Sequence, residues 1–160
     1  MTGTQAIDSA KYRQVLGHFP TGVTVITADP GPPVGMAVGS FASVSLDPAL
    51  VGFFAGKTST SWPRIRAAGS FCVNVLAEDQ EDVSRVFSSK AEDKFAGLGW
   101  SRAGSGSPVL DGVLAWIDCD LDQVVDAGDH DLVLGRVRSL EVARESGPLV
   151  FFRGGYSRLA

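Results

Sequence analysis

A turn of seven residues offers the clearest candidate for a phosphate-binding site. Residues 55–61 read Ala-Gly-Lys-Thr-Ser-Thr-Ser and lie between an apolar, strand-like run and a predicted helix over residues 62–68. One ammonium, four hydroxyl groups and the free N–H groups at the start of that helix could together bind a phosphate. The segment is not a P-loop, because Gly52 and Gly56 enclose three residues whereas that motif needs four between its glycines. An ordinary helix N-cap at Thr60 or Ser61 explains the same residues and is compatible with phosphate binding.

A stretch of small side chains offers a place for a flat ligand. Residues 34–45 read Val-Gly-Met-Ala-Val-Gly-Ser-Phe-Ala-Ser-Val-Ser, and small residues occupy both faces of the strand expected over 34–44. Small side chains let a planar ring or another backbone approach closely. Tight packing of strand against strand explains the same composition, and composition alone favours this second interpretation.

Two further segments carry charged or titratable groups. Residues 88–97 hold two lysines and a phenylalanine after an acidic segment, a pattern that by itself is typical of a solvated loop. Residues 128–131 read Gly-Asp-His-Asp, and glycine and aspartate are ordinary turn residues. His130 is one of only two histidines, and a loop tip places it well to contact a ligand and to titrate near neutrality.

Other classes of site have no motif in the sequence. No GxGxxG follows a strand, no GxSxG elbow is present, and neither CxxC nor HExxH occurs, so we expect neither a Rossmann nucleotide site nor a metal site. His18 and His130 have no neighbouring nucleophile, which gives little support to a hydrolase triad. Cys72 and Cys119 each lie in an apolar, strand-like segment and are predicted to be free, buried thiols.

The elements that must position these residues are mostly short strands. Apolar and β-branched runs predict strands, and helical spacing of apolar residues predicts helices. The predicted strands cover residues 23–27, 34–44, 50–55 and 71–76, and the predicted helices cover 11–19, 62–68 and 78–88. Tyr12, Val15, Leu16 and Phe19 form one apolar stripe of the first helix, while Val83, Val86 and Phe87 form the packing face of the last. Residues 97–112, rich in glycine and serine, are expected to be a loop.

A long hairpin is predicted around Gly128 from matching charges on its two arms. Alternation places Asp118 and Asp120 on one face of the first arm, and Arg136 and Arg138 on one face of the second. A turn centred near Gly128 would set Asp120 opposite Arg136 and Asp118 opposite Arg138, with about 0.2–1 kcal/mol from each pair. Such a hairpin favours a mostly β, antiparallel barrel whose openings are covered by helices.

The length and net charge of the chain limit the number of domains and the kinds of partner that it can have. With 160 residues the chain forms one domain, in which we expect residues 1–10 to be a flexible N-terminal arm. The net charge of −4 provides no basic field for a nucleic acid. The first ten residues lack the basic and apolar regions of a signal peptide, and no apolar run is long enough to span a bilayer, so we expect a cytoplasmic protein with no membrane contact.

Taken together, the segments resemble the flavin reductase family, the small NAD(P)H-dependent partners of two-component flavin monooxygenases. The resemblance covers nearly the whole chain and depends on the order and spacing of motifs that are individually weak. These motifs are residues 19–27 (Phe-Pro-Thr-Gly-Val-Thr-Val-Ile-Thr), 35–36, 40–41, 43–48 (Ser-Val-Ser-Leu-Asp-Pro), 71–76, 93–97 (Asp-Lys-Phe-Ala-Gly), 110–112, 128–130 (Gly-Asp-His) and 152–156. The resemblance implies an antiparallel, Greek-key-like FMN-binding split barrel with flanking helices. It also implies a homodimer whose flavin sites lie near the subunit interface.

The resemblance assigns roles to particular residues. The isoalloxazine ring and ribityl chain would be lined by Ala37, Val38, Gly39, Ser40, Phe41, Ser43 and Val44. The flavin phosphate would be held by Lys57, Thr58, Ser59 and Thr60, in agreement with the phosphate site argued above. A loop that closes on the flavin would contribute Lys90, Lys94 and Phe95, with the lysines as phosphate partners. His130 would contact the nicotinamide nucleotide, with Tyr156 nearby.

Two positions depart from the family pattern and bear on how flavin is held. Position 37 is commonly a hydroxyl residue in these reductases and position 39 is often polar, whereas this chain has Ala37 and Gly39. The loss of two side-chain hydrogen bonds favours flavin as a diffusing substrate, and it leaves FMN and FAD both open as the flavin. No arginine cluster for a 2′-phosphate is evident in the sequence, which favours NADH over NADPH.

The resemblance predicts a reductase that supplies reduced flavin to a monooxygenase acting on an aromatic substrate. Hydride transfer between the two cofactors needs no protein nucleophile, which agrees with the lack of a catalytic acid/base pair. One alternative is a flavin-binding carrier or sensor without turnover, which the Gly-Asp-His motif disfavours. A second is a relative of pyridoxine-phosphate oxidase, which would need a cluster of arginines and lysines that we do not find in the sequence.

Overall fold

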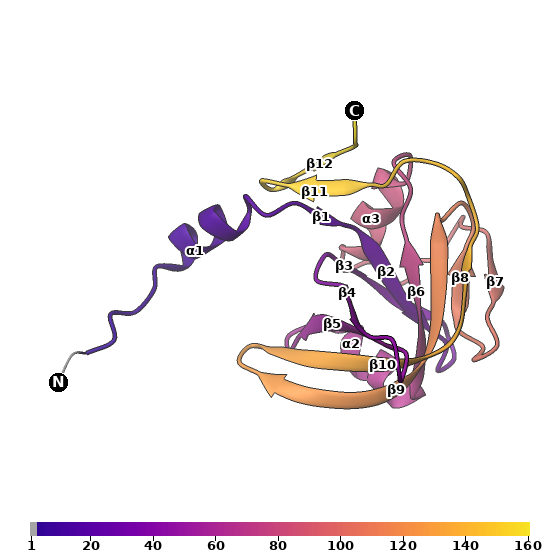
Figure 1. Cartoon of the computed structure of the whole chain (residues 1–160). Helices are drawn as coiled ribbons and strands as arrows, with labels where there is room; N and C mark the ends of the chain where they lie inside the picture. The colour runs from indigo at the N-terminus through magenta and orange to yellow at the C-terminus, as the bar shows by residue number, and fades with distance from the viewer. Residues whose placement is uncertain (1–2) are drawn as a thin grey trace.

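The computed structural model describes residues 3–160, and its centre is a curved, seven-stranded antiparallel sheet (Figure 1). The strand order is β3-β2-β6-β9-β10-β5-β4. The strands are β2 (Thr24–Ala28), β3 (Val34–Val38), β4 (Ala42–Ser45), β5 (Leu50–Gly56), β6 (Ser70–Val75), β9 (Ala115–Ala127) and β10 (His130–Val142). The prediction of a mostly β, antiparallel split barrel with flanking helices is confirmed.

Two small sheets and three helices complete the fold of residues 3–160. The small sheets are formed by β1 (Thr21–Gly22), β11 (Val150–Phe152) and β12 (Gly155–Ser157), and by β7 (Trp100–Arg102) and β8 (Pro108–Leu110). The helices are α1 (Ser9–Leu16), α2 (Trp62–Ala68) and α3 (Glu81–Phe87), and α2 has the predicted bounds. The expected loop over 97–112 is wrong, because it contains the β7–β8 hairpin, whose three-residue strands are too short to show alternation.

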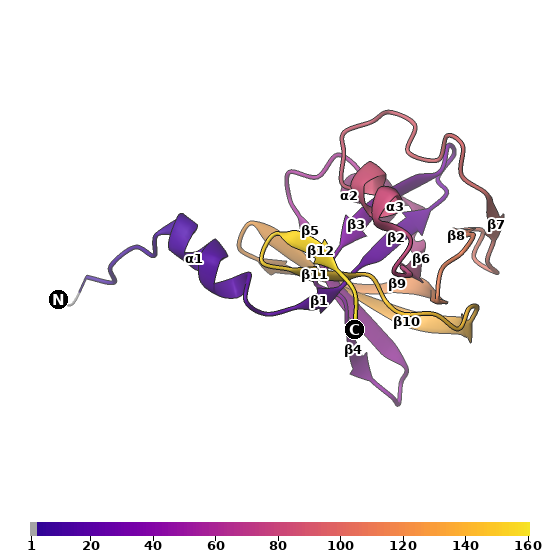
Figure 2. The same ribbon diagram turned by 90° about the horizontal axis from the view of Figure 1, so that it is seen from above.

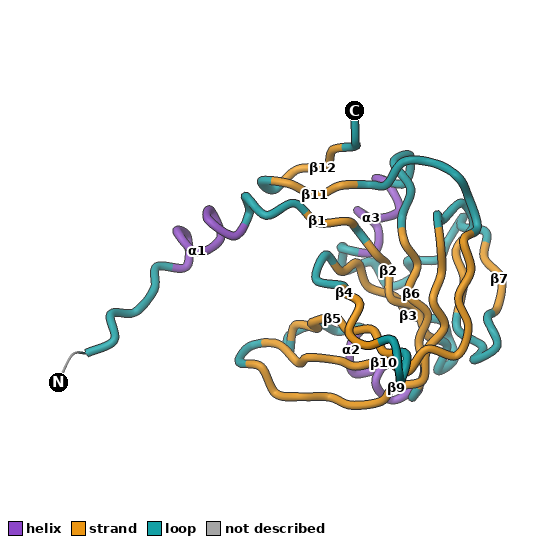
Figure 3. Tube along the Cα trace, viewed as in Figure 1, coloured by secondary structure: helices purple, strands orange, loops and turns teal. Residues whose placement is uncertain are grey.

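The single strand expected over residues 34–44 is also wrong, and the difference shapes the site. The segment divides into β3 and β4, which lie at opposite ends of the seven-stranded order (Figure 3). Ser40 marks the crossing, where its hydroxyl accepts from the Phe54 N–H (3.0 Å) and donates to the Phe54 carbonyl (3.3 Å). In the connection between β3 and β4, these two hydrogen bonds take the place of pairing with a neighbouring strand. Residues 34–45 therefore form both edge strands of the seven-stranded sheet.

The core consists of two clusters on either side of the sheet. One is built around Ile26, Phe53 and Phe71, and the other around Leu76 and Phe87. In α3 the predicted packing face is partly wrong: Phe87 is buried, but Val86 is exposed and Ser84 is buried in its place. The Phe53, Phe71 and Phe87 rings each pack edge to face with a neighbouring aromatic ring.

Both cysteines are free and buried, as predicted. Burial is the main cause that raises the pKa of each thiol, that of Cys119 to about 12. The nearby Asp118 carboxylate adds to both shifts. The two thiols are therefore protonated and inert at neutral pH.

The predicted hairpin forms, but neither of its two expected charge pairs does, because Arg136 pairs with Asp122 and Arg138 pairs with Asp120. Asp120 lies opposite Arg136 in the β9–β10 register, as predicted. Asp118 lies opposite Ser139, because the register shifts at two β-bulges. Instead of facing Arg138, the fully buried Asp118 carboxylate accepts from the Ser105 N–H (2.9 Å) and hydroxyl (2.6 Å).

Helix α1 stands away from the barrel in both ribbon views (Figures 1 and 2). The predicted apolar stripe is present, but none of the residues of α1 is buried. Tyr12 and Val15 are each 57% exposed and Phe19, just beyond the helix, is 74% exposed. The helix begins at Ser9, so it overlaps the expected arm over 1–10, whose first two residues lie outside the described part of the chain.

Within residues 3–160, each helix falls short of the length and apolar character that a bilayer crossing would require.

Candidate functional site

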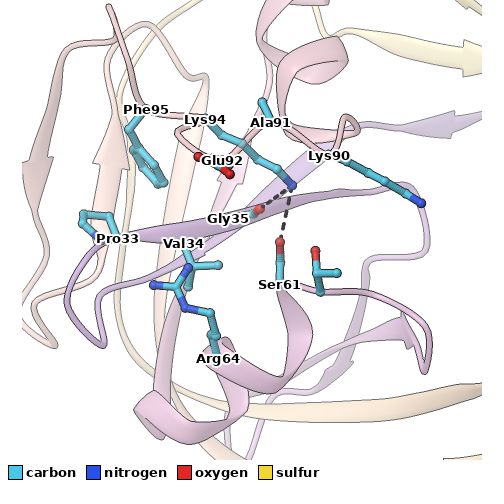
Figure 4. A pocket seen from close by; sticks show the side chains of 11 residues that line it. Pro33, Val34, Gly35, Ser61, Arg64, Lys90, Ala91, Glu92, Lys94 and Phe95 are labelled. Atoms are coloured by element: carbon cyan, nitrogen blue, oxygen red, sulfur yellow. Dashed lines mark hydrogen bonds between the residues drawn. The ribbon is translucent and has the colours of Figure 1, made fainter.

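A cavity of about 260 Å³ lies between β3, the start of α2 and the loop after α3 (Figure 4). It gathers four of the predicted site residues, Thr60, Lys90, Lys94 and Phe95. The rest of its wall is formed by Pro33, Val34, Gly35, Ser61, Arg64, Ala91 and Glu92. We call this space the main cavity.

The Lys94 side chain forms hydrogen bonds with three separate segments around the main cavity. Its ammonium donates to the Gly35 carbonyl and the Ser61 hydroxyl, at 3.3 Å each (Figure 4). It also donates to the Phe87 carbonyl at 3.2 Å. All three acceptors are neutral, and burial lowers the pKa of this half-buried group. The fold therefore holds a positive charge at the cavity wall without compensating it, which favours an anionic ligand.

The other two cations of the main cavity are likewise free of carboxylate partners. In the part of the chain that the structure describes, Arg64, Lys90 and Lys94 form no ion pair, although Glu92 lies in the same wall. The Arg64 guanidinium donates to the Pro32 carbonyl at 2.7 Å. Three cations without carboxylate partners at one cavity are the kind of environment that suits a phosphate group.

The hydroxyl-rich turn contributes to the cavity only in part. Thr60 lines it, whereas Ser59 accepts from the N–H groups of Ser61 and Trp62 (3.2 Å each) and so caps α2. Ser61, one of the two expected N-cap residues, occupies the N-cap position of α2, but its side chain forms no capping hydrogen bond and the Ser59 hydroxyl accepts from the N–H groups instead. Thr58 is exposed outside the cavity wall.

A second cavity of about 150 Å³ lies further along β3. It brings together the predicted residues Ala37, Val38, Gly39 and Tyr156, with Val23, Ser84, Ser88 and Phe151. The Tyr156 hydroxyl lies 2.8 Å from the Ser84 hydroxyl, and the Arg85 guanidinium sits 5.0 Å above the tyrosine ring. These contacts hold the ring of Tyr156 at the cavity wall. We call this space the second cavity.

The edge strand β3 runs from the main cavity to the second cavity. The small side chains along this segment have two separate explanations. Val34 and Gly35 line the main cavity, and Ala37 and Val38 line the second. A Cβ at Gly35 would lie 2.6 Å from the Phe87 ring, so tight packing explains this glycine. No aromatic ring packs against Gly39. The atom nearest to a Cβ at that position would be the Thr21 hydroxyl oxygen, at 3.1 Å.

His130 begins β10 at the hairpin tip, where it pairs with Gly56 at the end of β5. The Lys57 N–H donates to the Asp129 carbonyl (2.9 Å), so the tip and the hydroxyl-rich turn lie side by side. The Lys57 ammonium forms an ion pair with Asp126 and is outside the main-cavity wall. His130 Nδ1 lies 2.7 Å from the Asp129 carboxylate, which holds the pKa of that carboxyl below its usual value.

The remaining predicted residues lie around the β3–β4 connection. Ser40 uses its hydroxyl on Phe54, and Phe41 packs against the core. Ser43 and Val44 are exposed on β4. These four residues line neither of the two cavities described above.

Sequence reasoning missed Arg64 and with it the cluster of cations. The expectation that the chain holds no arginine and lysine cluster is wrong, because Arg64, Lys90 and Lys94 meet at one cavity. They come from α2 and from the loop after α3, so only the fold brings them together. A usable signal was the position of Arg64, in the first turn of the helix that follows the hydroxyl-rich turn. Among residues 3–160, no group of three or more His, Cys, Asp or Glu side chains is placed to hold a metal.

Comparison with known proteins assigns a family to this arrangement. Residues 16–160 match the family model described as a flavin reductase like domain. The chain is 55% identical over 157 residues to a flavin reductase of Pseudomonas putida, covering 97% of this chain and 92% of that protein. It is 53% identical over 154 residues to HsaB of Rhodococcus jostii, the reductase subunit of a flavin-dependent monooxygenase, covering 96% and 79%.

A solved structure gives the same result for the fold. The NADH:FAD oxidoreductase SgcE6 of Streptomyces globisporus, in complex with NAD and FAD fragments, superposes with a TM-score of 0.92 at 36% identity. The match covers 96% of this chain and 93% of that one. The barrel and the strand that joins the two cavities are therefore shared with a protein that binds both kinds of nucleotide.

Proposed function

Because this chain belongs to the flavin reductase like domain family, we propose that it is an NADH-dependent flavin reductase. It reduces FMN or FAD and passes the reduced flavin to a partner monooxygenase that acts on an aromatic substrate. The reductase-subunit name of the HsaB relative supports the partner, and the NADH:FAD oxidoreductase name of the SgcE6 structure supports the nucleotide.

The observation that carries this proposal is the uncompensated Lys94 ammonium at the main cavity. A half-buried cation with only neutral partners fits a phosphate, and the hydroxyls of Ser61 and Thr60 line the same wall. Lys90 adds a second cation there. Thr58 and Ser59 lie next to this wall, whereas Lys57 would reach a phosphate only by leaving Asp126.

Strand β3 is the element that would align the rest of the flavin. It runs from the main cavity to the second, and its five residues span about 16 Å at roughly 3.3 Å each. The small side chains of Ala37 and Gly39 leave its backbone open to a ring, and Ser40, Phe41, Ser43 and Val44 continue the surface across the split. Tyr156 and His130 would contact the nicotinamide nucleotide.

A bound flavin supplies the acceptor for a hydride from the nicotinamide ring. The task of this chain is then positioning and exclusion of water, which contribute most when reacting atoms are held about 3–3.5 Å apart. His130 is held by Asp129 at the hairpin tip, which favours orientation of the nucleotide over proton transfer. Ala37 and Gly39 offer no side-chain hydrogen bond, and this supports a flavin that enters and leaves as a substrate.

The test is NADH consumption by the purified protein with FMN, with FAD and without added flavin. We expect consumption only when flavin is added, and faster with NADH than with NADPH. A protein that retains flavin tightly and never oxidises NADH would overturn the proposal in favour of a flavin carrier.

We also propose that the protein is a homodimer, supported by the uncovered apolar stripe of α1. An eight-residue helix is marginal in water by itself, so a stripe of Tyr12, Val15 and Leu16 needs a covering surface. A second copy of this chain can provide that covering surface, and it is always present in a solution of the protein. Sedimentation equilibrium should give a dimer for the native chain and a monomer for Val15→Glu. A monomeric native chain would contradict the proposal.

A further inference from the structure

We propose that Trp100 is a positioning residue for the flavin phosphate, although it lies outside the wall of the main cavity. Its ring supports the Phe95 ring, and this support holds the neighbouring Lys94 ammonium in place at the cavity. The inference rests on the proposed function, because it names a residue that acts on the same site through Lys94.

The loop that carries Lys94 and Phe95 has little structure of its own. Residues 88–99, between the end of α3 and the start of β7, form no helix or strand. Within this range all side chains except those of Lys94, Phe95 and Leu98 are exposed. The Phe95 N–H donates to the Asp93 carboxylate at 3.0 Å, a contact internal to the loop. The position of the loop at the cavity therefore depends on its few packed side chains.

Three aromatic rings form a row from the core to β7, with Phe95 in the middle. The Phe95 ring packs edge to face with Phe87, at 5.1 Å between centroids and 85° between planes. On its other side it packs with Trp100, at 5.9 Å and 66°. Phe87 is fully buried, whereas Phe95 and Trp100 are partly buried. Because such ring pairs favour particular orientations, two neighbours fix the Phe95 ring better than Phe87 alone would.

Lys94 is attached to the core end of the same row. A Cβ at Gly35 would lie 2.6 Å from the Phe87 ring, so these two residues are in close contact. The Lys94 ammonium donates to the Gly35 carbonyl at 3.3 Å (Figure 4). It donates to the Phe87 carbonyl at 3.2 Å. Since Lys94 directly precedes Phe95 in the chain, a displaced Phe95 ring would move the lysine backbone and weaken both hydrogen bonds.

Trp100 is itself held from two sides. It lies opposite Leu110 in the β7–β8 hairpin, and the Leu110 N–H donates to the buried Asn74 side chain of β6 at 2.8 Å. The Arg102 guanidinium lies 5.1 Å from the centroid of the Trp100 ring and forms an ion pair with Asp29. Trp100 is therefore fixed to the central sheet and can support a loop that is not.

A purely structural role for Trp100 is the alternative, because its ring also packs against the core cluster around Leu76 and Phe87. That role predicts a loss of folding stability when the ring is removed, and nothing more. A positioning role predicts in addition a loss of flavin affinity that depends on the presence of Lys94. The two roles are therefore separated by measuring flavin binding and unfolding on the same variants.

The first experiment is a double-mutant cycle of Trp100→Ala and Lys94→Met, with the Kd of FMN measured by quenching of flavin fluorescence. With Lys94 present, we expect Trp100→Ala to raise the Kd roughly two- to tenfold, as for the loss of one aromatic pair. In the Lys94→Met background it should leave the Kd unchanged, because the ammonium that it positions is absent. An unchanged Kd in the presence of Lys94, or an equal increase in both backgrounds, would overturn the inference.

Two further variants serve as rescue and control. Trp100→Phe keeps a ring beside Phe95 and should bind FMN nearly as the native chain does. Trp116→Ala is the matched control, since Trp116 is a partly buried tryptophan of β9 that lines neither cavity. It should leave the Kd unchanged even where urea unfolding shows a lower stability. A Kd raised equally by Trp116→Ala would show a general effect of lost packing and would also overturn the inference.

The aromatic character of position 100 can be tested even if Trp100→Ala does not fold. Trp100→Leu keeps apolar bulk without a ring and takes its place in the cycle, with the same expected direction. Native affinity in Trp100→Leu would overturn the inference, because bulk alone would then suffice.

Steady-state kinetics distinguish this inference from the proposed function. Trp100→Ala should raise the KM of FMN and leave kcat at saturating FMN unchanged, because the support acts on binding. A lower kcat with an unchanged KM would contradict it. If the native protein oxidises no NADH with either flavin, the reductase function fails whatever the cycle shows. If native turnover is normal but Trp100 and Lys94 are not coupled, only the positioning role fails.

Discussion

The cations of the β9–β10 hairpin and those of the main cavity differ in one respect. In the hairpin, Arg138 pairs with Asp120 at 3.1 Å and Arg136 pairs with Asp122 at 3.3 Å. In the main cavity Arg64, Lys90 and Lys94 form no such pair within the described residues. Paired charges cancel over a short distance, whereas uncompensated ones remain available to an anionic ligand. The location of unpaired cations therefore indicates function better than the number of ion pairs does.

The two regions also differ in what charge does to stability. The hairpin pairs are exposed, and such pairs contribute little because water screens them. Lys94 is half-buried among neutral acceptors, so folding disfavours its charged form and lowers its pKa. A charge retained against this cost is better explained by a ligand than by stability.

Replacing Lys94 should have the largest effect. Lys94→Met removes the ammonium that donates to three acceptors at and beside the main cavity, and hydrogen bonds to charged groups contribute about 1.5–3 kcal/mol each. We expect the Kd of the flavin to rise at least about tenfold, measured by quenching of flavin fluorescence. Lys11→Met, on the exposed helix α1, is the control and should bind flavin as the native chain does. Equal affinities of the two variants would contradict a role for Lys94 at the phosphate.

The charge of Lys94 also predicts a dependence on pH. Its folded pKa is below the ordinary value of 10.5, so the folded state releases this proton before the unfolded state does. As pH rises through that window, flavin affinity should fall because the ammonium is lost, while the contribution of Lys94 to folding stability should improve. Flavin titrations across alkaline pH test this against Lys94→Met. The difference between the two proteins should shrink as pH rises, and a constant difference would contradict the prediction.

The fold was largely predictable where the signal is local. Alternating charges located the β9–β10 hairpin and put Asp120 opposite Arg136, and apolar spacing located α2. The bulges that remove Asp118 from Arg138 were not predictable, because a bulge depends on how both strands pack and leaves no alternation of its own. The break of residues 34–44 into β3 and β4 was missed for a similar reason, since it depends on a hydrogen bond from Ser40 to the distant Phe54.

The candidate site was predictable in part. The hydroxyl-rich turn and the Lys90–Phe95 loop were found from their residue types, and the main cavity unites Thr60 with Lys90 and Phe95. Arg64 was missed because an isolated arginine in a helix has no motif, and its meaning depends on the loop that folds against it. The ion pair between Lys57 and Asp126 could not be predicted from the sequence either, because the register of the hairpin brings Asp126 near Lys57.

The packing of the hairpin stem gives the next largest effect. A Cβ at Gly135 would lie 2.5 Å from the Phe71 ring and 3.1 Å from the Cys119 Cβ, whereas at Gly56 the nearest atom would be 3.8 Å away. Overpacking of a core costs about 1–3 kcal/mol. Urea unfolding should therefore show Gly135→Ala destabilised by that amount and Gly56→Ala nearly unchanged. Equal stability of the two variants would contradict the prediction and would show that the packing around Gly135 has room for a methyl group.

His130 tests whether the hairpin tip belongs to the site. Its ring is held by Asp129 and is about half exposed, so removal should cost no more than one ordinary hydrogen bond to a ligand, about 0.5–1.5 kcal/mol. We expect His130→Ala to raise the KM of NADH by roughly two- to tenfold and to leave the Kd of the flavin unchanged. An unchanged KM together with an unchanged kcat would remove His130 from the nucleotide site.

The smallest effect is expected from the ion pair between Arg138 and Asp120. Both side chains are about half exposed, so their interaction should contribute about 0.2–1 kcal/mol to folding. A double-mutant cycle with Arg138→Gln and Asp120→Asn isolates this coupling, and added salt should abolish it. Neither variant should change flavin affinity, because this pair lies in the compensated region of the molecule. A loss of flavin binding in Arg138→Gln would show that paired cations also attract the ligand, and the contrast between the hairpin and the main cavity would no longer identify the site.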